Sequence, residues 1–547
     1  MDVLQSFRFL DLPRELRDMV YEHYVHIDGG YIFNYRLSKF QGAKRQSINL
    51  SLMLTCKLVA AEMCGVALRE NTITFTTACS EDFRIRAGRY SCILDDLWNT
   101  QAYMLAIAGA KITSNVTAHV ARHYPMYSPI VERLGKRVTL ETPQDRYIEL
   151  TSNTMGEAVS THRSFLGSTL QLLGNEIDLA ALRREESLRE AVNYADQVAK
   201  RKFEQSQPGL LPFDLVPWEI PEESKLDGIR SSPNWLTWEK SHDNRFWNAF
   251  EYSISAAAVA TAYLGSMPAK RRTQIRDIIL HEDKLAVARP ECHALGLIEF
   301  CVENPRLRVE RYVNLWRSAF PLVSDFRSVR RERKRDGLRP KDVTEAVSLW
   351  ISEAHALVPS GMPPKAFSLI LDGDQIPERT AQIFEEVVQR DATWEAALAK
   401  GMELKYGPET NAIQRWHRLE DLDDSEYDRN APRYRYKHLS RALCDVSTST
   451  DIVRCSFYVT PLWEMNQNMN RILRENHELP LFVPARTPTS FIHGASAATS
   501  ASAGAQIFAR VSPLWTLWMT GGLCSRKGKV PQEKLESWGL WGYHICI

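Results

Sequence analysis

Two amphipathic segments and a strand-like run follow one another in residues 7–76, and this pattern constrains the fold more than any other part of the chain. Pro13 suits the first turn of a helix, where its missing N–H removes no hydrogen bond. Apolar side chains then recur at helical spacing and predict one apolar stripe on that helix. The stripe consists of Leu12, Leu16, Met19, Val20 and Tyr24. Residues 31–37 are rich in aromatic and β-branched types, which predicts a short strand.

A second helical stripe lies within residues 50–68. Its members are spaced by four, three, three and four residues, which places them on one helix face; they are Leu54, Leu58, Ala61, Cys64 and Leu68. Asn71 is expected to end this helix. Ile73 and Phe75 then alternate with threonines, which predicts a half-buried strand.

These segments resemble the F-box-like module that opens many fungal proteins. The resemblance rests on two helix starts, Leu12-Pro13-Arg14-Glu15-Leu16 and Leu52-Met53-Leu54-Thr55-Cys56-Lys57. It implies a small helical module that binds the Skp-type adaptor of a cullin ubiquitin ligase. By position, the resemblance implies six partner-binding residues, namely Leu12, Pro13, Leu16, Val20, Leu54 and Leu58. Burial of each aliphatic side chain in a groove of the adaptor would contribute roughly 1.5–3 kcal/mol.

The pattern departs from an F-box at one point, because F-boxes run as one block and residues 28–47 interrupt this one. The interruption leaves an alternative open, in which both stripes pack on each other and on the following domain. Residues 276–305 are similar to a stretch of the same fungal group, which extends the resemblance over most of the chain without adding a known chemistry.

Length and composition are those of a globular protein. The chain has 547 residues, of which 44% are hydrophobic and 25% charged, enough for roughly three or four domains. A formal net charge of +1 gives no general argument for a nucleic acid or an anionic membrane as partner. The first residues lack a secretory pattern and no apolar run reaches ~20 residues, so we expect an intracellular protein of the cytoplasm or nucleus. The ten scattered cysteines include no Cys-x-x-Cys pair and are expected to be small buried hydrophobes.

We expect a mainly α (α+β) fold, in which a helical module is followed by a large helix-rich body with a few short strands. Proline density, charge runs and small-residue composition divide the chain further. The divisions are residues 1–80 as the F-box-like module, 81–206 as a helix-rich region, 207–234 as a Pro-rich linker or loop, 235–483 as the α+β body, and 484–547 as a low-complexity link with a Trp-containing tail, for which disorder and docking are both open.

Several sequence patterns in the body could indicate a metal, catalytic or ligand site. For each of them we favour a purely structural role. Zinc ligands are present as His281, Cys292, His293 and Cys301, but their spacings match no ribbon or finger, so the sequence predicts no metal site. His281 beside Glu282 and Asp283 is expected to be a polar strand end rather than an acid–base group. The aromatic residues of segment 235–250 are expected to be core rather than a ligand cage.

A basic run, Arg330 to Arg335, is compatible with a nuclear import signal or with a phosphate-binding patch. No aromatic residues interleave it, so a platform for stacking bases is unsupported. A solvated helix end is the favoured interpretation.

The best enzyme motif is an apolar strand that ends in Asp372-Gly373-Asp374, followed by a helix from Pro377 to Val388. Two carboxylates at a strand end resemble the Mg²⁺-dependent attack site of haloacid-dehalogenase-like phosphatases. In the alternative, both aspartates cap free N–H groups at a helix entry.

We therefore predict a non-enzymatic adaptor without a cofactor. Its module would bind the Skp-type adaptor and its body, residues 83–480, would hold a protein client. An interaction or regulatory protein without a ligase link is the first alternative, and a phosphatase at Asp372 and Asp374 is a remote one. No P-loop, dinucleotide fingerprint or repeat of a known substrate receptor is present in the sequence.

Overall fold

The computed structural model describes residues 8–45, 47–79, 81–135, 150, 156–177, 215–220, 222, 224, 226, 253–321, 340–393, 395–396, 436, 439–448 and 452–459. Several predicted features lie outside these residues. They are most of the Pro-rich linker, the aromatic segment 235–250, the basic run Arg330 to Arg335 and the tail 484–547.

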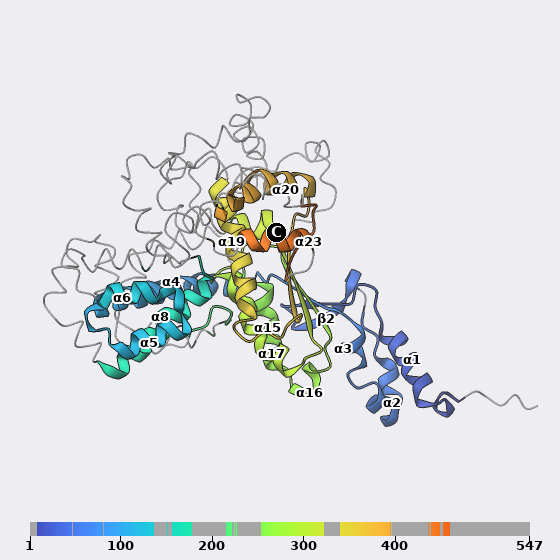
Figure 1. Ribbon diagram of the computed structural model, residues 1–547. Helices are drawn as coiled ribbons and strands as arrows, with labels where there is room; N and C mark the ends of the chain where they lie inside the picture. Colours follow the sequence, from blue (N-terminus) through green and yellow to red (C-terminus); the bar gives the residue numbers. More distant parts are fainter. Residues whose placement is uncertain are drawn as a thin grey trace, which may run out of the picture.

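Seven strands form one mixed sheet at the centre of the molecule, in the order β2-β1-β3-β4-β5-β6-β7 (Figure 1). Only β1 and β2 pair as an antiparallel hairpin, and every other neighbouring pair among the described strands is parallel. The strands are β1 (Tyr31–Asn34), β2 (Lys39–Gly42), β3 (Ile73–Thr76), β4 (Asp277–Glu282), β5 (Arg308–Asn314), β6 (Phe367–Asp372) and β7 (Val453–Cys455).

The expected mainly α (α+β) fold is wrong, because the chain has an α/β fold built on a largely parallel sheet. Local strand predictions are confirmed at β1, β3 and β6. What the local patterns could not reveal is the pairing. Residues 77–276 lie between β3 and β4, which are nevertheless direct neighbours, and parallel strands always pair across such long connections.

The helices of the body pack on one face of the sheet. From β3 to β7 the strands follow chain order, and right-handed crossovers that advance in one direction place their helices on the same side. Along β5, Val309, Arg311 and Val313 are buried beneath these helices, whereas Glu310 and Tyr312 on the opposite face are only partly buried. The helices of this part are α15 (Ala256–Ser266), α16 (Ala269–Arg272), α17 (Ile298–Glu303), α19 (Pro340–Leu357), α20 (Pro377–Ile383) and α23 (Leu439–Thr448), with the 3-10 segment η7 (Pro290–Leu297) and the π segments η8 (Leu315–Ala319) and η9 (Phe384–Gln389).

A buried carboxylate ties the sheet to its covering helices. Glu282, at the end of β4, receives two hydrogen bonds from Arg311 of β5, from Nη2 at 2.6 Å and from Nε at 2.9 Å, both on Oε1. Its carboxylate also accepts from the backbone N–H groups of Ala256 and Ala257, at 2.9 and 3.3 Å. These groups belong to the first turn of α15, where the helix dipole favours a negative charge.

The partner cation is equally well satisfied. Arg311 donates to the carbonyl oxygens of Pro290 and Glu291 in η7, at 2.7 and 3.3 Å. Its guanidinium also lies over the Trp350 ring of α19, 4.6 Å from the centroid. One ion pair therefore joins two strands and three helical elements.

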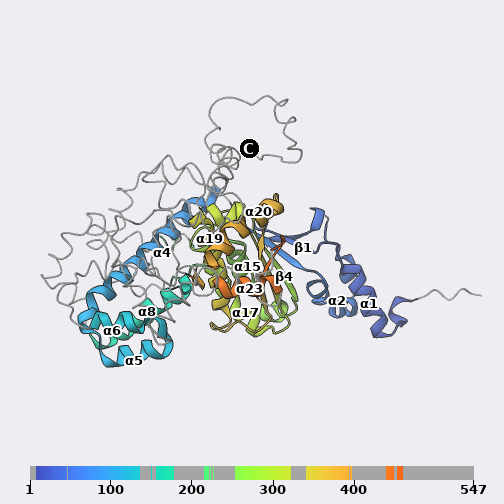
Figure 2. The same ribbon diagram turned by 45° about the horizontal axis from the view of Figure 1, so that its top comes forward.

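Two hydrophobic clusters share one long helix, α4 (Glu81–Ala108). In its first half, Tyr90 and Leu94 belong to the cluster beneath the sheet, which we call the sheet core. In its second half, Ala102 and Leu105 belong to a separate cluster, the helical lobe (Figure 2). The lobe also contains α5 (Ser114–His123), α6 (Ser128–Gly135) and α8 (Val159–Glu176), with the 3-10 segments η4 (Gly109–Lys111) and η5 (Pro125–Tyr127).

A third, smaller cluster holds the N-terminal module together. The module comprises η1 (Phe9–Asp11), α1 (Arg14–Val25), η3 (Ser51–Leu54), α2 (Lys57–Glu62) and α3 (Val66–Glu70), while η2 (Ala43–Arg45) follows β2. Its buried residues are Tyr21, Val25, Val59, Met63 and Val66. The predicted helix over 50–68 is broken because Gly65 adopts φ +81°, which favours glycine, and a Cβ there would lie 2.7 Å from Gln274.

Asn71 joins this module to the sheet. Its Nδ2 donates to the carbonyl oxygens of Val25 and Ala67, at 2.9 and 3.0 Å, and its Oδ1 accepts from the N–H of Ile27 at 2.8 Å. One buried amide thus holds the ends of α1 and α3 directly before β3. Among the helices that the structure describes, none combines the length and the apolarity needed to cross a membrane.

Replacing Arg311 tests the central ion pair. We expect Arg311→Met to destabilise the protein by about 3–5 kcal/mol, because Glu282 is left charged and unpaired in the core. The double variant Glu282→Gln/Arg311→Met should recover much of that loss, since glutamine still accepts from α15 without carrying a charge. Urea denaturation measures the effect, and Arg454→Met on β7, whose side chain is about half exposed, should change stability by no more than about 0.5 kcal/mol. Equal losses in the single and double variants would contradict the role of the unpaired charge.

Candidate functional site

Helix α1 turns three members of its predicted apolar stripe, Leu16, Met19 and Val20, away from the module core. Tyr21 and Val25 are buried, whereas Leu16 is 45% exposed and Met19 and Val20 are exposed to a similar or greater extent. In a helix, residues 16 and 20 lie on a different face from 21 and 25, so burial of one set leaves the other outside. These three members of the predicted stripe are therefore available to a partner, whereas Tyr24 packs against the module core and Leu12 is half-buried.

Polar contacts around Glu62 explain this orientation of α1. Arg17 forms a bidentate pair with the Glu62 carboxylate, at 2.7 and 3.0 Å, and the Tyr21 hydroxyl donates to it at 2.7 Å. Arg14 contacts the same carboxylate at 2.9 Å. The Arg17 guanidinium, together with these other donors, lowers the pKa of Glu62 to about 2, whereas burial raises the pKa of Tyr21 to about 12. The charged network fixes which side of α1 faces α2.

The second predicted stripe is also exposed at Leu54, Leu58, Ala61 and Cys64, whereas Leu68 packs against the sheet core. Leu54 is 87% exposed and Leu58 is half exposed, while their neighbours Val59 and Met63 form the core. Seven of the twelve large hydrophobic residues that are exposed in the described chain lie in residues 10–20 and 50–58. We call them the exposed apolar set: Leu10, Leu16, Met19, Val20, Leu50, Leu54 and Leu58.

Five of the six predicted partner-binding residues are exposed, and Leu12 is half-buried; the five are Pro13, Leu16, Val20, Leu54 and Leu58. They come from α1, η3 and α2, and α1 and α2 lie side by side in both views (Figures 1 and 2). Scattered exposed hydrophobic residues are normal on a protein, but a concentration on one small module is typical of an interaction surface.

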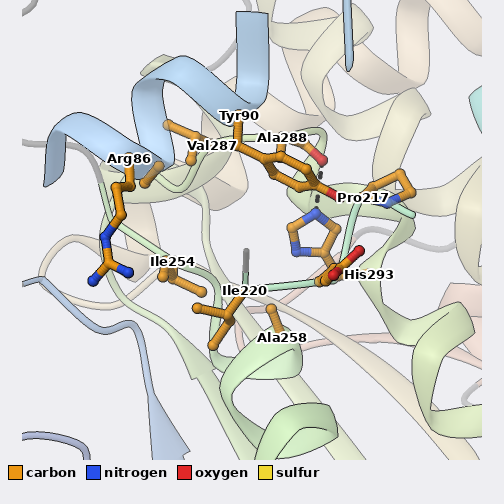
Figure 3. A pocket seen from close by; sticks show the side chains of 11 residues that line it. Arg86, Tyr90, Pro217, Ile220, Ile254, Ala258, Val287, Ala288 and His293 are labelled. Carbon is orange, nitrogen blue, oxygen red and sulfur yellow. Dashed lines mark hydrogen bonds between the residues drawn. The ribbon is translucent and has the colours of Figure 1, made fainter. Parts of the chain in front are cut away.

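A second candidate lies beneath the sheet, where Ser255 and His293 form a buried pair. The Ser255 Oγ lies 2.6 Å from His293 Nδ1. His293 Nε2 lies 2.7 Å from the carbonyl oxygen of Ala288 (Figure 3). A carbonyl only accepts, so Nε2 carries the proton and Nδ1 accepts from the serine hydroxyl. The same Oγ accepts from the N–H of Ala258 at 3.0 Å and caps α15.

This pair resembles part of a nucleophilic site, but its surroundings favour a structural role. Burial lowers the pKa of His293 to about 3, and every nitrogen of the ring has a hydrogen-bond partner. The adjoining cavity, lined by Tyr90 and Ile220 among others, measures about 20 Å³, which is room for about one water molecule. No substrate could therefore reach the serine in this conformation.

The side chains considered as zinc ligands are not brought together. His281 lies on the other face of the sheet, where its ring is 5.2 Å from that of Tyr312. Cys292 donates to the carbonyl oxygen of Arg289, and Cys301 is buried in α17. The described residues contain no group of three or more His, Cys, Asp or Glu side chains placed to hold a metal ion.

Asp372 lies at the carboxyl end of β6, as the phosphatase alternative requires. Its Oδ1, however, accepts from the hydroxyl of Ser456 at 2.7 Å and from the N–H of Asp374 at 3.2 Å. These bonds join the end of β6 to the residue after β7, and Pro377 begins α20 as expected. The parallel strands advance from β3 to β7 without reversing, so β6 is not at a topological switch point, where α/β sheets open a crevice for ligands.

Sequence reasoning missed the residues that orient these sites. Glu62 stands between the buried Val59 and Met63, and Arg311 stands between Val309 and Val313 in β5. A charged residue within an apolar pattern is the only local signal, and it does not reveal the partner.

Comparisons with protein-family models, with curated proteins and with solved structures found no match for this chain.

Substitution of His293 should change how the free energy of unfolding of the protein depends on pH. In the unfolded chain this imidazole binds a proton below pH ~6.5. In the folded protein its pKa is lowered to about 3, so protonation requires a much lower pH. The stability contributed by the neutral ring is thus complete above pH ~6.5 and falls on acidification, with a slope approaching about 1.4 kcal/mol per pH unit. His293→Asn keeps an acceptor for Ser255 but does not titrate, so its urea midpoint should fall less steeply between pH 6 and 4. His281→Asn on the opposite face is the control, and equal slopes in His293→Asn and wild type would contradict the assignment.

Proposed function

We propose that the N-terminal module docks this protein onto the Skp-type adaptor of a cullin ubiquitin ligase, and that the body, residues 83–480, holds a protein client. One observation carries the proposal: five of the six residues that the F-box-like resemblance assigns to adaptor contact are exposed, although most are large and apolar. The function proposed is binding, without a chemical step.

The energetics of the exposed apolar set support a protein partner. Each aliphatic side chain that moves from water into a partner's groove contributes roughly 1.5–3 kcal/mol. Leu16 and Val20 are one helical turn apart on α1, which suits a helix that lies along an apolar groove. Three or four such anchors are enough to offset the entropy lost on association.

The attachment of the module also suits an adaptor role. The hairpin β1–β2 and strand β3 come from the same stretch of chain as the module and belong to the sheet. Arg69 of α3 donates to the side chain of Gln274 at 3.1 Å, and Asn71 joins both helices to the entry of β3. A partner bound at α1 and α2 would therefore be held in a defined orientation relative to the body.

The test is a titration of the full chain against a purified Skp-type adaptor. We expect Leu16→Asp and Leu54→Asp each to weaken binding at least tenfold, because each places a charge in the apolar contact. Both residues are exposed, so the melting temperature should change little. The matched controls are Val302→Asp and Val358→Asp, which are 57% and 47% exposed in the body and should bind like wild type.

Two outcomes would overturn the proposal. In one, the wild-type chain binds no adaptor although its module is folded. In the other, all four variants bind with the wild-type affinity. If wild type and controls capture a different protein that Leu16→Asp and Leu54→Asp lose, the exposed apolar set serves an interaction without a ligase link.

A further inference from the structure

The sheet core and the helical lobe meet across a seam that contains buried carboxyl groups. Helix α19 of the core contacts α8 of the lobe, and Glu353 is one of the α19 residues in this contact. Its Oε1 accepts from the backbone N–H of Ser160, in the first turn of α8, at 2.8 Å. Its Oε2 is buried without a hydrogen-bond partner among the described residues, and the residue is only 2% exposed.

A second carboxyl group in the seam is equally poorly compensated. Glu291 of η7 is buried, and neither of its carboxyl oxygens has a hydrogen-bond partner in the part of the chain that the structure describes. Its nearest cation, Arg289, is 4.0 Å away. That guanidinium also approaches Asp95 at 3.5 Å and lies over the Trp98 ring of α4 at 5.2 Å. Among the residues that the structure describes, neither buried carboxylate therefore has a close, dedicated counter-ion.

The groups around Glu353 come from each element packed against it. Helix α8 contributes the N–H of Ser160 and the cation Arg163, η7 contributes Glu291 and Cys292, and η5 contributes Tyr127. Burial is the strongest influence and raises the pKa of Glu353 to about 7, against the lowering effect of Ser160. Burial raises the pKa of Glu291 as well. The helix dipole at the amino end of α8 favours the charged form of the Glu353 carboxyl group, but the cost of desolvating that charge is larger.

The backbone at the seam is strained. Ala288 and Arg289 adopt φ +64° and +61°, so two successive residues with side chains are in the left-handed region directly before Pro290. The turn is held by Ser91 Oγ, which accepts from the N–H of Ala288 at 3.1 Å, and by His293 on its carbonyl oxygen. Strain of this kind persists only where surrounding contacts impose it, and here those contacts come from the first half of α4 and from η7.

We infer that Glu353 is a proton-dependent clamp: its neutral carboxyl holds α8 against α19, and its ionisation releases the helical lobe from the sheet core. The ionised carboxylate would be buried beside Glu291, whereas opening of the seam returns both groups to water. Helix α4 runs through both hydrophobic clusters, so the lobe stays attached to the sheet core when the contact between α8 and α19 opens. This inference concerns a different part of the molecule from the exposed apolar set and does not depend on adaptor binding.

Hydrogen exchange of the full-length protein tests the clamp. Protection factors, which are corrected for the intrinsic pH dependence of exchange, are measured for the first turn of α8 and for β4 between pH 5.5 and 8.5. In wild type we expect protection of the amides of Ser160 and His162, which donate to Glu353 and to the carbonyl oxygen of Ala158, to fall at least tenfold as the pH rises through 7, while β4 stays protected. Small-angle scattering should show a larger radius of gyration over the same range.

The decisive variant is Glu353→Gln, which keeps an acceptor for Ser160 and removes the titration. Its α8 protection should stay high and constant with pH. Glu299→Gln, the same chemical change at an exposed position of α17, should behave like wild type. The inference is wrong if wild-type protection does not change with pH, or if Glu353→Gln loses protection as wild type does. Should Glu353→Gln fail to fold, wild type alone decides, because parallel loss at α8 and β4 would mean global unfolding instead of lobe release.

Discussion

The ion pair between Glu282 and Arg311 is the interaction on which the sheet and its covering helices depend. Burial of two charges is costly, and such a pair often adds little net stability compared with apolar residues of the same size. Its value lies in specificity. The Glu282 carboxylate and the Arg311 guanidinium meet only when β4 and β5 are in one register. The carboxylate also accepts from backbone N–H groups of α15, and the guanidinium also donates to carbonyl oxygens of η7. An apolar pair at these positions would keep the alternation of buried residues, which also specifies register, but would lose the directional bonds to α15 and η7.

Polar contacts of the same kind decide the surface of the N-terminal module. Glu62 takes Arg17 and Tyr21 to the inner side of α1, and the leucines and Val20 are left in water. An isolated amphipathic helix would instead bury its apolar stripe. The buried carboxylate thus leaves Leu16, Met19 and Val20 of the stripe in water, an arrangement typical of a surface that binds a partner.

The sequence was sufficient for local structure and insufficient for arrangement. Pro13 and Pro377 mark helix starts, and the alternation around Ile73 marks β3, because these signals depend on backbone geometry within a few residues. The pattern of β5 is hidden by Arg308, Glu310 and Arg311, the last of which is tolerated in the core only through Glu282. Strand order and the inward side of α1 both depend on partners far away in the chain. The six proposed contact residues could be named from the resemblance, but their exposure follows from Glu62, which no local pattern identifies.

Attachment of the module through Asn71, β1 and β3 has a geometric consequence. Two domains joined by a flexible linker sample a volume set by the linker length, and each finds its target at a corresponding effective concentration. Here the chain enters the sheet directly from α3, with a buried amide bonded to both helices. Anything held by the sheet and its covering helices would therefore be presented to a partner of the module at one distance and one angle. The rigid shape of the protein would then fix the distance between a bound client and the partner of the module. A client of the wrong size would not bridge that distance, even if no contact discriminated against it.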